Sequence, residues 1–280
     1  MNLNAKESKS NSIIFSTEDR IVMGILNITK DSFYDGGRYI NNQKIIARCK
    51  SMLEEGAAII DIGAQSSRPG AIQVSSRKEL EKLIPTIKLL KNTFKDITIS
   101  VDTFWSNTAK ECIRSGANII NDISAGEKDK NMFSTITELN VPYIIMHMQG
   151  TPQNMQKEPS YNNITKEIIT YFKNKINQLH KAGFYKIIID PGFGFGKTIE
   201  HNYKLLNNLQ KFKSLETPIL IGTSRKSMIY NLLNVTPQDA LNGTSITNTI
   251  ALQNGANILR VHDVKEAMEC IKITTFAKKY

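Results

Sequence analysis

At 280 residues, 40% of them hydrophobic, the chain can bury the core of one α/β domain without a second domain. Its formal net charge of +10 would suit an anionic partner, but the lysines are scattered through helical segments, so we expect a solvated basic surface and no nucleic-acid binding. Three cysteines without CxxC spacing argue against a disulfide framework and a zinc site. No apolar run is long enough to span a bilayer, and the first residues lack a signal peptide's apolar core, so we expect a cytoplasmic protein with no membrane partner.

Residues 1–19 are predicted to form a polar N-terminal arm, and residues 20–280 a single domain. Along this domain, short apolar runs alternate with segments whose apolar residues recur at helical spacing, which indicates a parallel sheet covered by helices. The expected strands are residues 21–27, 57–63, 97–103, 118–122, 142–148, 186–190, 218–226 and 257–262. The expected helices are residues 43–55, 75–94, 106–115, 130–139, 162–182, 201–212, 226–233, 237–253 and 264–276.

The sheet is predicted to close into a barrel. The chain supplies eight β/α units, and the turn after its first strand, ITKDSFYDGG, lacks the GxGxxG of an open doubly wound sheet. The expected fold class is α/β, a single-domain (β/α)8 TIM barrel, in which catalytic groups stand at the carboxyl ends of the strands. Each apolar run here ends in a polar or charged residue: Asn27, Asp61, Asp102, Asn121, His147, Asp190, Lys226, and Arg260 with His262.

Three loops at this end of the predicted barrel are long, namely residues 28–41, 63–74 and 148–160. Long loops in a compact domain commonly act as lids or binding loops. The second contains GAQSSRPG, whose hydroxyls and planar guanidinium suit phosphate oxygens. An arginine in an ordinary surface turn remains the alternative for this loop taken alone.

The segment PGFGFGKT is similar to a nucleotide-binding P-loop but does not match it, because Pro191 stands where the first glycine is required. Nucleotide triphosphate binding is therefore not predicted. We expect these glycines to let the backbone approach a flat ring.

Seven blocks of the sequence are recognisable together: MGILNITKDSFYDGG, DIGAQSSRPG, SVDTF, NDISAG, DPGFGFGKT, TSRKSMI and RVHDV. In order and spacing they closely resemble the signature blocks of the dihydropteroate synthases of the pterin-binding family, from about Arg20 to the C-terminus. The resemblance implies a (β/α)8 barrel that condenses a dihydropterin-methyl pyrophosphate with p-aminobenzoate, releasing pyrophosphate and forming dihydropteroate. It also implies a homodimer and inhibition by sulfonamides.

The chemistry of a pterin explains several of these residue types. Its ring presents an amine beside a ring N–H, so one carboxylate at the bottom of a pocket can accept both hydrogen bonds, and we assign this role to Asp190. By resemblance, Asn121 pairs with another ring edge and Lys226 donates to a ring carbonyl or nitrogen. If the C–O bond breaks before the amine attacks, a fixed carboxylate stabilises the methylene cation, which makes Asp102 the candidate for electrostatic catalysis. The expected pterin-binding residues are Asp102, Asn121, Met146, Asp190, Lys226 and Arg260, and those expected to be catalytic are Asp102 and Lys226.

The resemblance assigns the pyrophosphate to cationic and hydroxyl side chains together with a bound Mg²⁺. Magnesium takes oxygen ligands, keeps several waters and completes its shell with phosphate oxygens, so one protein oxygen is a plausible minimum, and Asn27 is the expected ligand. Arg260 and His262 are two residues apart and share one face of a strand. The expected pyrophosphate-binding residues are Asn27, Ser67, Arg68, Arg260 and His262.

The p-aminobenzoate pocket is expected to be built from loops. Ser227 begins a predicted helix, where free backbone N–H groups favour a carboxylate. The residues that the resemblance places around this substrate are Phe33, Ser67, Pro69, Phe195, Lys226 and Ser227. Structural alternatives stay open for individual residues: Asp102 as a helix cap, Asn27 as a turn residue, and Phe33 as simple packing. Asp61 is expected to hold pocket neighbours by hydrogen bonds.

The chain departs from the family pattern in its first two loops. Lys30 replaces a proline, and Ala64, Gln65 and Ser67 stand where the pattern usually has Gly, Glu and Thr. Gln65 removes a negative charge beside the phosphate region. Our hypothesis is that these changes tune loop ordering and sulfonamide affinity without abolishing synthesis.

Two other functions remain open from sequence alone. A methyltetrahydrofolate corrinoid methyltransferase would bind a pterin without pyrophosphate, but the SSRPG loop and the TSRKS block count against it. A non-catalytic pterin- or sulfonamide-binding barrel is favoured only by the departures in the loops. The apolar positions that could serve either the core or a dimer interface include Ile250, Leu252, Ile271 and Phe276.

Overall fold

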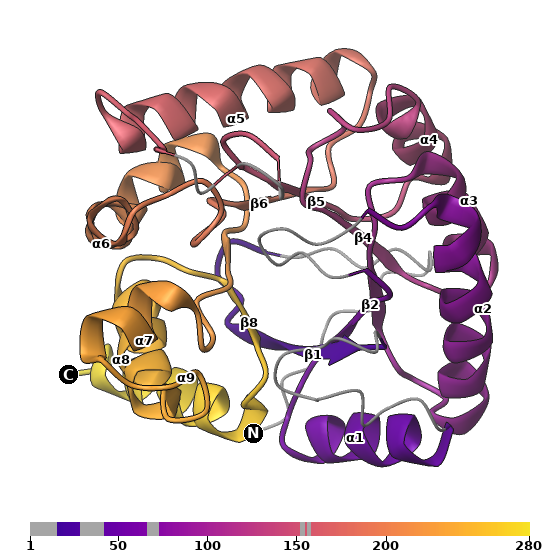
Figure 1. Cartoon of the computed structure of the whole chain (residues 1–280), viewed down its shortest axis with the longest axis horizontal. Coiled ribbons are helices and arrows are strands. Elements are labelled where there is room, and N and C mark those ends of the chain that lie inside the picture. The colour runs from indigo at the N-terminus through magenta and orange to yellow at the C-terminus, as the bar shows by residue number, and fades with distance from the viewer. Residues whose placement is uncertain (1–15, 29–41, 66–72, 152–154, 156–157) are drawn as a thin grey trace.

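A computed structural model of the chain describes residues 16–28, 42–65, 73–151, 155 and 158–280. Within these residues, eight strands form one parallel sheet in the order β6-β5-β4-β3-β2-β1-β8-β7. A bridge between Ile189 and Ile219 joins β6 to the segment entering β7, so the sheet's two edges meet. The predicted single-domain (β/α)8 TIM barrel is confirmed (Figure 1). The strands are β1 (Ile21–Asn27), β2 (Ile59–Gly63), β3 (Ile99–Asp102), β4 (Ile119–Asp122), β5 (Tyr143–Met146), β6 (Ile187–Asp190), β7 (Leu220–Ile221) and β8 (Ile258–Val261).

Helices surround the sheet on its outer side (Figure 1). They are α1 (Asn42–Glu54), α2 (Ser76–Thr93), α3 (Ser106–Arg114), α4 (Met132–Leu139), α5 (Ile164–Lys181), α6 (Ile199–Asn207), α7 (Ser227–Leu233), α8 (Leu241–Gln253) and α9 (Val264–Ala277). Among the described residues, the helices are too short or too polar to cross a membrane. The expected polar arm falls mostly outside the described part of the chain.

The expected helix at 201–212 is wrong in its second half. The α-helix ends at Asn207, and Leu209–Leu215 form a 3-10 helix, η1. Its buried residues are Leu209, Phe212 and Leu215, a spacing of three that matches the three residues per turn of this helix type. The tighter turn therefore keeps one apolar edge against the barrel.

The barrel interior is built in layers. An apolar layer contains Met23, Ile59, Ile119, Ile144, Ile188, Leu220 and Ile258. Because side chains alternate along a strand, the residue two positions further on points to the same interior. Those positions hold Ile25, Asp61, Asn121, Met146, Asp190, Gly222 and Arg260. An apolar floor thus lies directly beneath a layer rich in charged and amide side chains.

The alternate strand positions face the helices and form the larger core. Ile60 and Ile62 of β2, for example, are buried with Leu83 and Ile87 of α2 in one apolar cluster. Each such fully buried side chain contributes about 1.5–3 kcal/mol. This packing fixes the strand register, and so fixes which residues face the interior.

Candidate active site

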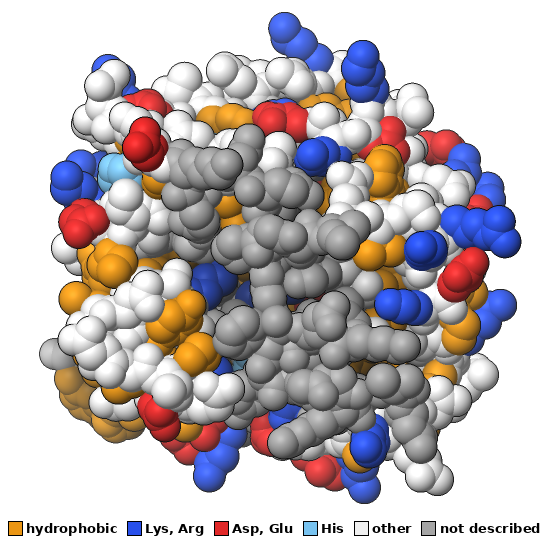
Figure 2. Space-filling view, viewed as in Figure 1, with side chains coloured by type: hydrophobic (Ala, Val, Ile, Leu, Met, Phe, Trp, Pro, Cys, Tyr) orange, Lys and Arg blue, Asp and Glu red, His pale blue; other side chains and the backbone are white. Residues whose placement is uncertain are grey.

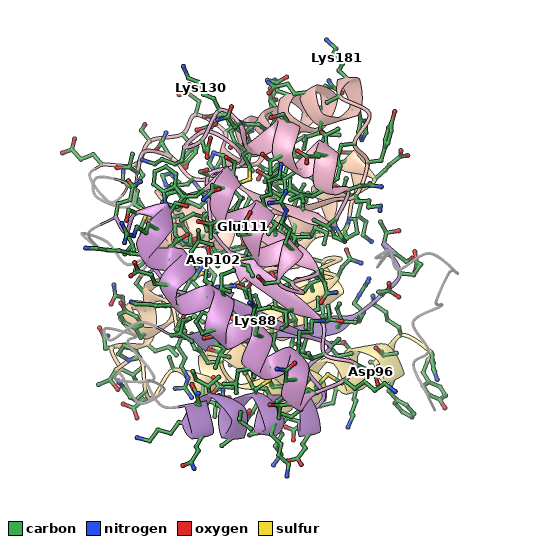
Figure 3. The ribbon with its side chains drawn as sticks, turned by 90° about the vertical axis from the view of Figure 1, so that its right-hand side faces the viewer. Lys88, Asp96, Asp102, Glu111, Lys130 and Lys181 are labelled. Atoms are coloured by element: carbon green, nitrogen blue, oxygen red, sulfur yellow. The ribbon has the colours of Figure 1, made fainter. Side chains whose placement is uncertain are left out.

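One guanidinium joins three strands at the carboxyl end of the barrel. Arg260 on β8 donates from Nε to Asp61 Oδ2 at 2.7 Å and from a terminal nitrogen to Asp102 Oδ2 at 3.2 Å. Asn121 on β4 donates from Nδ2 to the same Asp61 oxygen at 3.1 Å. In Figure 3, Asp102, which ends β3, is labelled near the middle of the molecule, and Asp96, which precedes that strand, is labelled at the lower right.

The register of the strands sets these side chains level with one another. Asn27 pairs with Gly63, Gly63 with Asp102, and Asp102 with Asn121, across β1 to β4. A Cβ on Gly63 would lie 3.2 Å from Asn27 Oδ1 and 3.7 Å from Asp102 Cβ. The absence of a side chain on Gly63 therefore gives the amide of Asn27 and the carboxylate of Asp102 room to face one space.

Asp190 and Lys226 carry opposite charges and influence each other electrostatically in the site. Asp190 ends β6, and its Oδ1 accepts a hydrogen bond from Gly192 N at 2.7 Å. Lys226 donates from Nζ to Phe193 O at 2.6 Å, and its Nζ lies 4.7 Å from the centre of the Phe195 ring. The expectation that Lys226 ends a strand is wrong, because β7 stops at Ile221 and Lys226 is the N-cap residue of α7. The intervening turn still brings its ammonium to the site.

Burial shifts the protonation of these groups. Burial raises the pKa of Asp102 to about 7; Arg260 opposes the rise, while neighbouring carboxylates, Asp61 foremost, add to it. Burial likewise raises the pKa of Asp190, against the opposing effect of Lys226. The pKa of Lys226 falls to about 8, mainly through burial, with Asp190 opposing the fall. Shifts of this kind in neighbouring buried groups are typical of a functional site.

His262 follows β8 and is half-buried beside Ser224. Its Nδ1 lies 3.1 Å from Ser224 Oγ, and Ser224 Oγ accepts a hydrogen bond from the His262 N–H at 3.2 Å. Burial, and then the charge of Arg260, lower the pKa of His262 to about 3. The imidazole is therefore neutral at physiological pH and can offer a hydrogen bond but no positive charge.

An apolar cluster adjoins the charged groups. Met146 at the end of β5 and Phe195 after β6 are buried in it, and Met146 is level with Asp190 in the sheet. The other buried members are Phe104, Ile123 and Met155. Ser227 is the first residue of α7, directly after Lys226. Four expected site residues lie outside the described residues: Phe33, Ser67, Arg68 and Pro69.

One of the open structural alternatives is resolved, and the expectation for Asp61 is confirmed. Asp102 does not cap α3, because Asp129 Oδ2 accepts from both the N–H and the hydroxyl of Ser106 at the start of that helix. Asp61 does hold its pocket neighbours by hydrogen bonds, as expected, and it is fully buried. Because side chains alternate along β2, Asp61 lies in the interior layer. This alternation is the sequence signal that could have marked Asp61 as a site residue.

Sequence reasoning missed Lys197, which lies at the end of the GFGFGK segment and is only 3% exposed. Its only sequence signal was a charged residue at the end of a glycine-rich run that fails the P-loop pattern. The structure gives two of these glycines a packing role that the sequence did not indicate. A Cβ on Gly192 would lie 1.9 Å from His147 O, and one on Gly196 would lie 2.4 Å from Gln149 O, so these glycines accommodate the neighbouring backbone.

The geometry agrees with the family to which the sequence is similar. The family model described as "Pterin binding enzyme" matches residues 23–262. The chain belongs to the pterin-binding enzymes. Dihydropteroate synthase from Escherichia coli K12 is 42% identical over 254 residues, which cover 90% of this chain and 89% of that protein.

Solved structures of pterin-binding enzymes extend the likeness to three dimensions. A Yersinia pestis dihydropteroate synthase with a sulfonamide drug complex has a TM-score of 0.92 and 39% identity, covering 100% of both chains. A Xanthomonas albilineans dihydropteroate synthase with 4-aminobenzoic acid has a TM-score of 0.86 and 34% identity, covering 94% of this chain and 95% of that one. The activity of this pterin-binding enzyme is accordingly that of a dihydropteroate synthase, a transferase of folate synthesis.

Proposed function

We propose that the polar layer condenses a dihydropterin-methyl pyrophosphate with p-aminobenzoate and that its residues divide the work as follows. The observation that carries the proposal is the single guanidinium of Arg260 shared between the carboxylates of Asp61 and Asp102 above an apolar floor. A methyltransferase that binds a pterin has no diphosphate to bind, so it would not need a cationic group such as Arg260 for that purpose. The ligands of the similar Yersinia and Xanthomonas enzymes, a sulfonamide and 4-aminobenzoic acid, support an arylamine as the second substrate.

In this proposal the pterin ring lies above the apolar floor and contacts Met146. Asp190 accepts hydrogen bonds from the ring amine and ring N–H, and its ionised form is favoured by Lys226 nearby. Lys226 donates to the ring carbonyl or a ring nitrogen, exchanging its bond to Phe193 O. Asn121, oriented by Asp61, meets another edge of the ring.

The proposed reaction breaks the bond between the pterin methylene carbon and the pyrophosphate oxygen, and that electron pair leaves with pyrophosphate. The arylamine nitrogen then forms the new C–N bond and releases one proton to water. Positive charge develops on the methylene, and Asp102 stabilises it in a site shielded from water. Arg260 holds the Asp102 carboxylate in place and, at the same edge of the barrel, faces the departing diphosphate.

The diphosphate is proposed to lie between Arg260 and His262, with Ser67 and Arg68 completing its contacts. Arg260 supplies fixed positive charge, since a guanidinium does not deprotonate in proteins. His262 is neutral and contributes a hydrogen bond from the ring nitrogen that does not face Ser224. In this proposal Arg260 compensates the negative charge of the diphosphate, and the neighbouring His262 contributes a hydrogen bond without charge.

Magnesium is proposed as the cofactor, held by the side-chain oxygen of Asn27. Among the described residues no group of three or more His, Cys, Asp or Glu side chains could hold a metal ion. The one oxygen of Asn27, left room by Gly63, fits an ion that takes most of its ligands from water and phosphate. When bound, Mg²⁺ would neutralise charge on the leaving pyrophosphate.

The arylamine is proposed to enter from the loop side, against Phe195 and Lys226. The buried Phe195 ring offers an apolar wall, and Ser227 at the start of α7 would meet the carboxylate end of p-aminobenzoate. Phe33, Ser67 and Pro69 are proposed to close this pocket. Sulfonamides, as arylamines of similar shape, would compete for the same space.

A pyrophosphate-release assay tests this function. We expect release, and dihydropteroate formation, only when the pterin pyrophosphate, p-aminobenzoate and Mg²⁺ are all present. Hydrolysis of the pterin pyrophosphate at the same rate without the arylamine, or binding without turnover, would contradict it. Methyl transfer to a corrinoid would instead identify the alternative activity.

A homodimer is also proposed. Exposed apolar side chains gather on three helices that are neighbours in Figure 1, α7, α8 and α9. They are Leu232, Leu233, Ile246, Ile273 and Phe276, each at least half exposed. A second copy of the chain would cover this apolar surface.

A cytoplasmic location is proposed in addition. Cys49, Cys112 and Cys270 are free and buried, and burial raises the pKa of the Cys49 and Cys112 thiols to about 12. Unpaired thiols are usual in reducing compartments. Fractionation of cells that express the full chain tests the location.

A further inference from the structure

The loop between β6 and α6 encloses an ammonium group that the proposed reaction does not use. Lys197 Nζ lies 2.8 Å from Gly192 O, 2.9 Å from Phe195 O, and 3.2 Å and 3.4 Å from Nδ1 and O of His147. In the part of the chain that the structure describes, no carboxylate lies within hydrogen-bond distance of Nζ. A lysine is almost never this buried without a charged partner, so its burial requires another explanation.

The surroundings of Lys197 are arranged to receive it. Met146 points into the barrel, so the next residue, His147, points outward, where its ring meets Tyr161 and Tyr171. Burial, and then the charge of Lys197, lower the pKa of His147 to about 2, so the neutral ring can accept a hydrogen bond at Nδ1. Burial lowers the pKa of Lys197 itself to about 7, against the opposing charge of Asp190.

The backbone that surrounds Lys197 also carries the substrate side of the site. Gly192 accepts from Lys197 through its carbonyl and donates through its N–H to Asp190 Oδ1 at 2.7 Å. Phe195 accepts from Lys197 through its carbonyl, while its ring lies 4.7 Å from Lys226 Nζ. Between them, Phe193 O accepts from Lys226 at 2.6 Å. Lys197 thus contacts the loop on its outward side, and Lys226 contacts it on the side proposed to face the substrate.

We propose that Lys197 is a positioning residue for substrate binding: its buried ammonium fixes the peptides of Gly192 and Phe195, and through them the Asp190 carboxylate and the Phe195 ring. This inference rests on the proposed function, in which Asp190 binds the pterin and Phe195 forms a wall of the p-aminobenzoate pocket. Three glycines with positive φ, Gly192, Gly194 and Gly196, give the loop the shape that turns two carbonyls toward one point. The ammonium then prevents those carbonyls from being left buried without a donor.

The test replaces Lys197 by methionine, which keeps the apolar stem and removes the donors, and by glutamine, which keeps an N–H donor. The matched control is Lys91→Met. Lys91 on α2 also donates to a main-chain carbonyl, Ile97 O at 2.7 Å, but at the opposite end of the barrel, before β3. A loss of stability alone would therefore appear in both methionine variants.

We expect Lys197→Met to raise the KM for p-aminobenzoate and for the pterin pyrophosphate by about 10-fold or more, with a smaller fall in kcat, because small displacements of binding groups weaken productive geometry. Lys197→Gln should fall between Lys197→Met and the parent, and Lys91→Met should keep both KM values. The chain has a single tryptophan, Trp105, which packs against the cluster containing Phe195, so its fluorescence should shift in Lys197→Met and not in the control.

Unchanged KM values and fluorescence in a folded Lys197→Met variant would overturn the inference. If that variant does not fold, the same comparison made with Lys197→Gln decides it, with equal KM values for Lys197→Gln and the parent overturning the inference. Failure of the proposed function is distinguishable, since it would appear in the parent enzyme as pyrophosphate release that does not require p-aminobenzoate.

Discussion

Asp102 and Asp61 compete for one positive charge. Arg260 donates to both, but Asp61 takes the shorter bond, 2.7 Å against 3.2 Å, and is also hydrogen-bonded to Asn121. One guanidinium compensates about one carboxylate, so ionised Asp102 is incompletely paired in the absence of substrate. In the proposed reaction, this negative charge would stabilise a cation that forms only as the C–O bond breaks, which is the condition for selective stabilisation of the transition state.

Replacing Asp102 by asparagine should therefore stabilise the free protein at alkaline pH while impairing catalysis. The folded-state pKa of Asp102 is raised from 3.8 to about 7, so the folded state binds more protons than the unfolded state between these values. Stability then falls as pH rises through that window, and the asparagine variant escapes this loss. We expect a gain in the free energy of unfolding of about 1 kcal/mol or more at pH 8 and a smaller gain at pH 5, with kcat reduced about 100-fold.

Urea denaturation of parent and variant at the two pH values, with Arg77→Gln on the exposed side of α2 as a control, measures this difference. A variant that is equally destabilised at pH 5 and pH 8 would show that Asp102 is stably paired in the free protein.

How far single residues could be predicted depends on where their partners lie. Asp102 and Asp190 end apolar strands, and Asn121 and Arg260 lie one residue before the ends of theirs. Strand alternation alone directs these side chains into the barrel interior. Lys197 could not be found this way, because its partners are main-chain carbonyls whose direction is set by the φ angles of the loop. Nor does the sequence say that Arg260 divides its hydrogen bonds between two carboxylates, since that depends on distances across three strands.

The loop between β6 and α6 shows how one element serves packing and function together. Gly192 has φ +72°, and a Cβ there would lie 1.9 Å from His147 O, so side chains are excluded both by conformation and by space. The same loop offers its carbonyls to Lys197 and Lys226. The glycine at this position is therefore required by close contact with the loop after β5. The sequence pattern alone does not reveal that contact.

Gly192→Ala and Gly183→Ala form a matched pair for this element. Gly183, between α5 and β6, has φ +79°, but nothing lies within 4 Å of a Cβ there, so its substitution costs only the left-handed conformation, about 1 kcal/mol. Gly192→Ala must also displace backbone, and we expect a loss of about 3 kcal/mol or more in the free energy of unfolding and a raised KM for the pterin substrate. Equal losses in the two variants would contradict the contact with His147.

Element boundaries followed the sequence where apolar spacing was long and regular, as in α2 and α5, whose ends lie within two residues of those expected. They failed where a polar turn sits inside an apolar block. The run 218–226 contains only the two strand residues of β7, because the segment after Ile221 turns to place Lys226 at the start of α7. Hydrophobic periodicity cannot distinguish a short strand followed by a turn from a longer strand.

On the surface of the whole molecule, charged side chains are scattered, whereas exposed apolar side chains are concentrated on α7, α8 and α9. On the face shown in Figure 2, Lys and Arg are scattered among Asp, Glu and uncharged side chains, which agrees with a solvated basic surface. Of the apolar positions left open by the sequence, Leu252 and Ile271 are buried in the core, whereas Phe276 is 62% exposed. The helices α7 to α9 pack against the barrel on one side and expose apolar side chains on the other. An exposed apolar surface of this kind is suited to association with another protein chain.

The proposed homodimer should depend on that surface. We expect Ile273→Glu combined with Phe276→Glu, both on α9, to convert a dimer to a monomer in sedimentation velocity, because two buried charges per subunit would oppose association. Tyr185→Glu is the control, since Tyr185 is 69% exposed but lies before β6, at the amino end of the barrel. A dimer that survives the α9 substitutions and dissociates with Tyr185→Glu would move the interface to the opposite end of the strands. If the parent protein sediments as a monomer at all concentrations, the proposed homodimer is wrong, and a second copy of this chain does not cover the exposed side of α7 to α9.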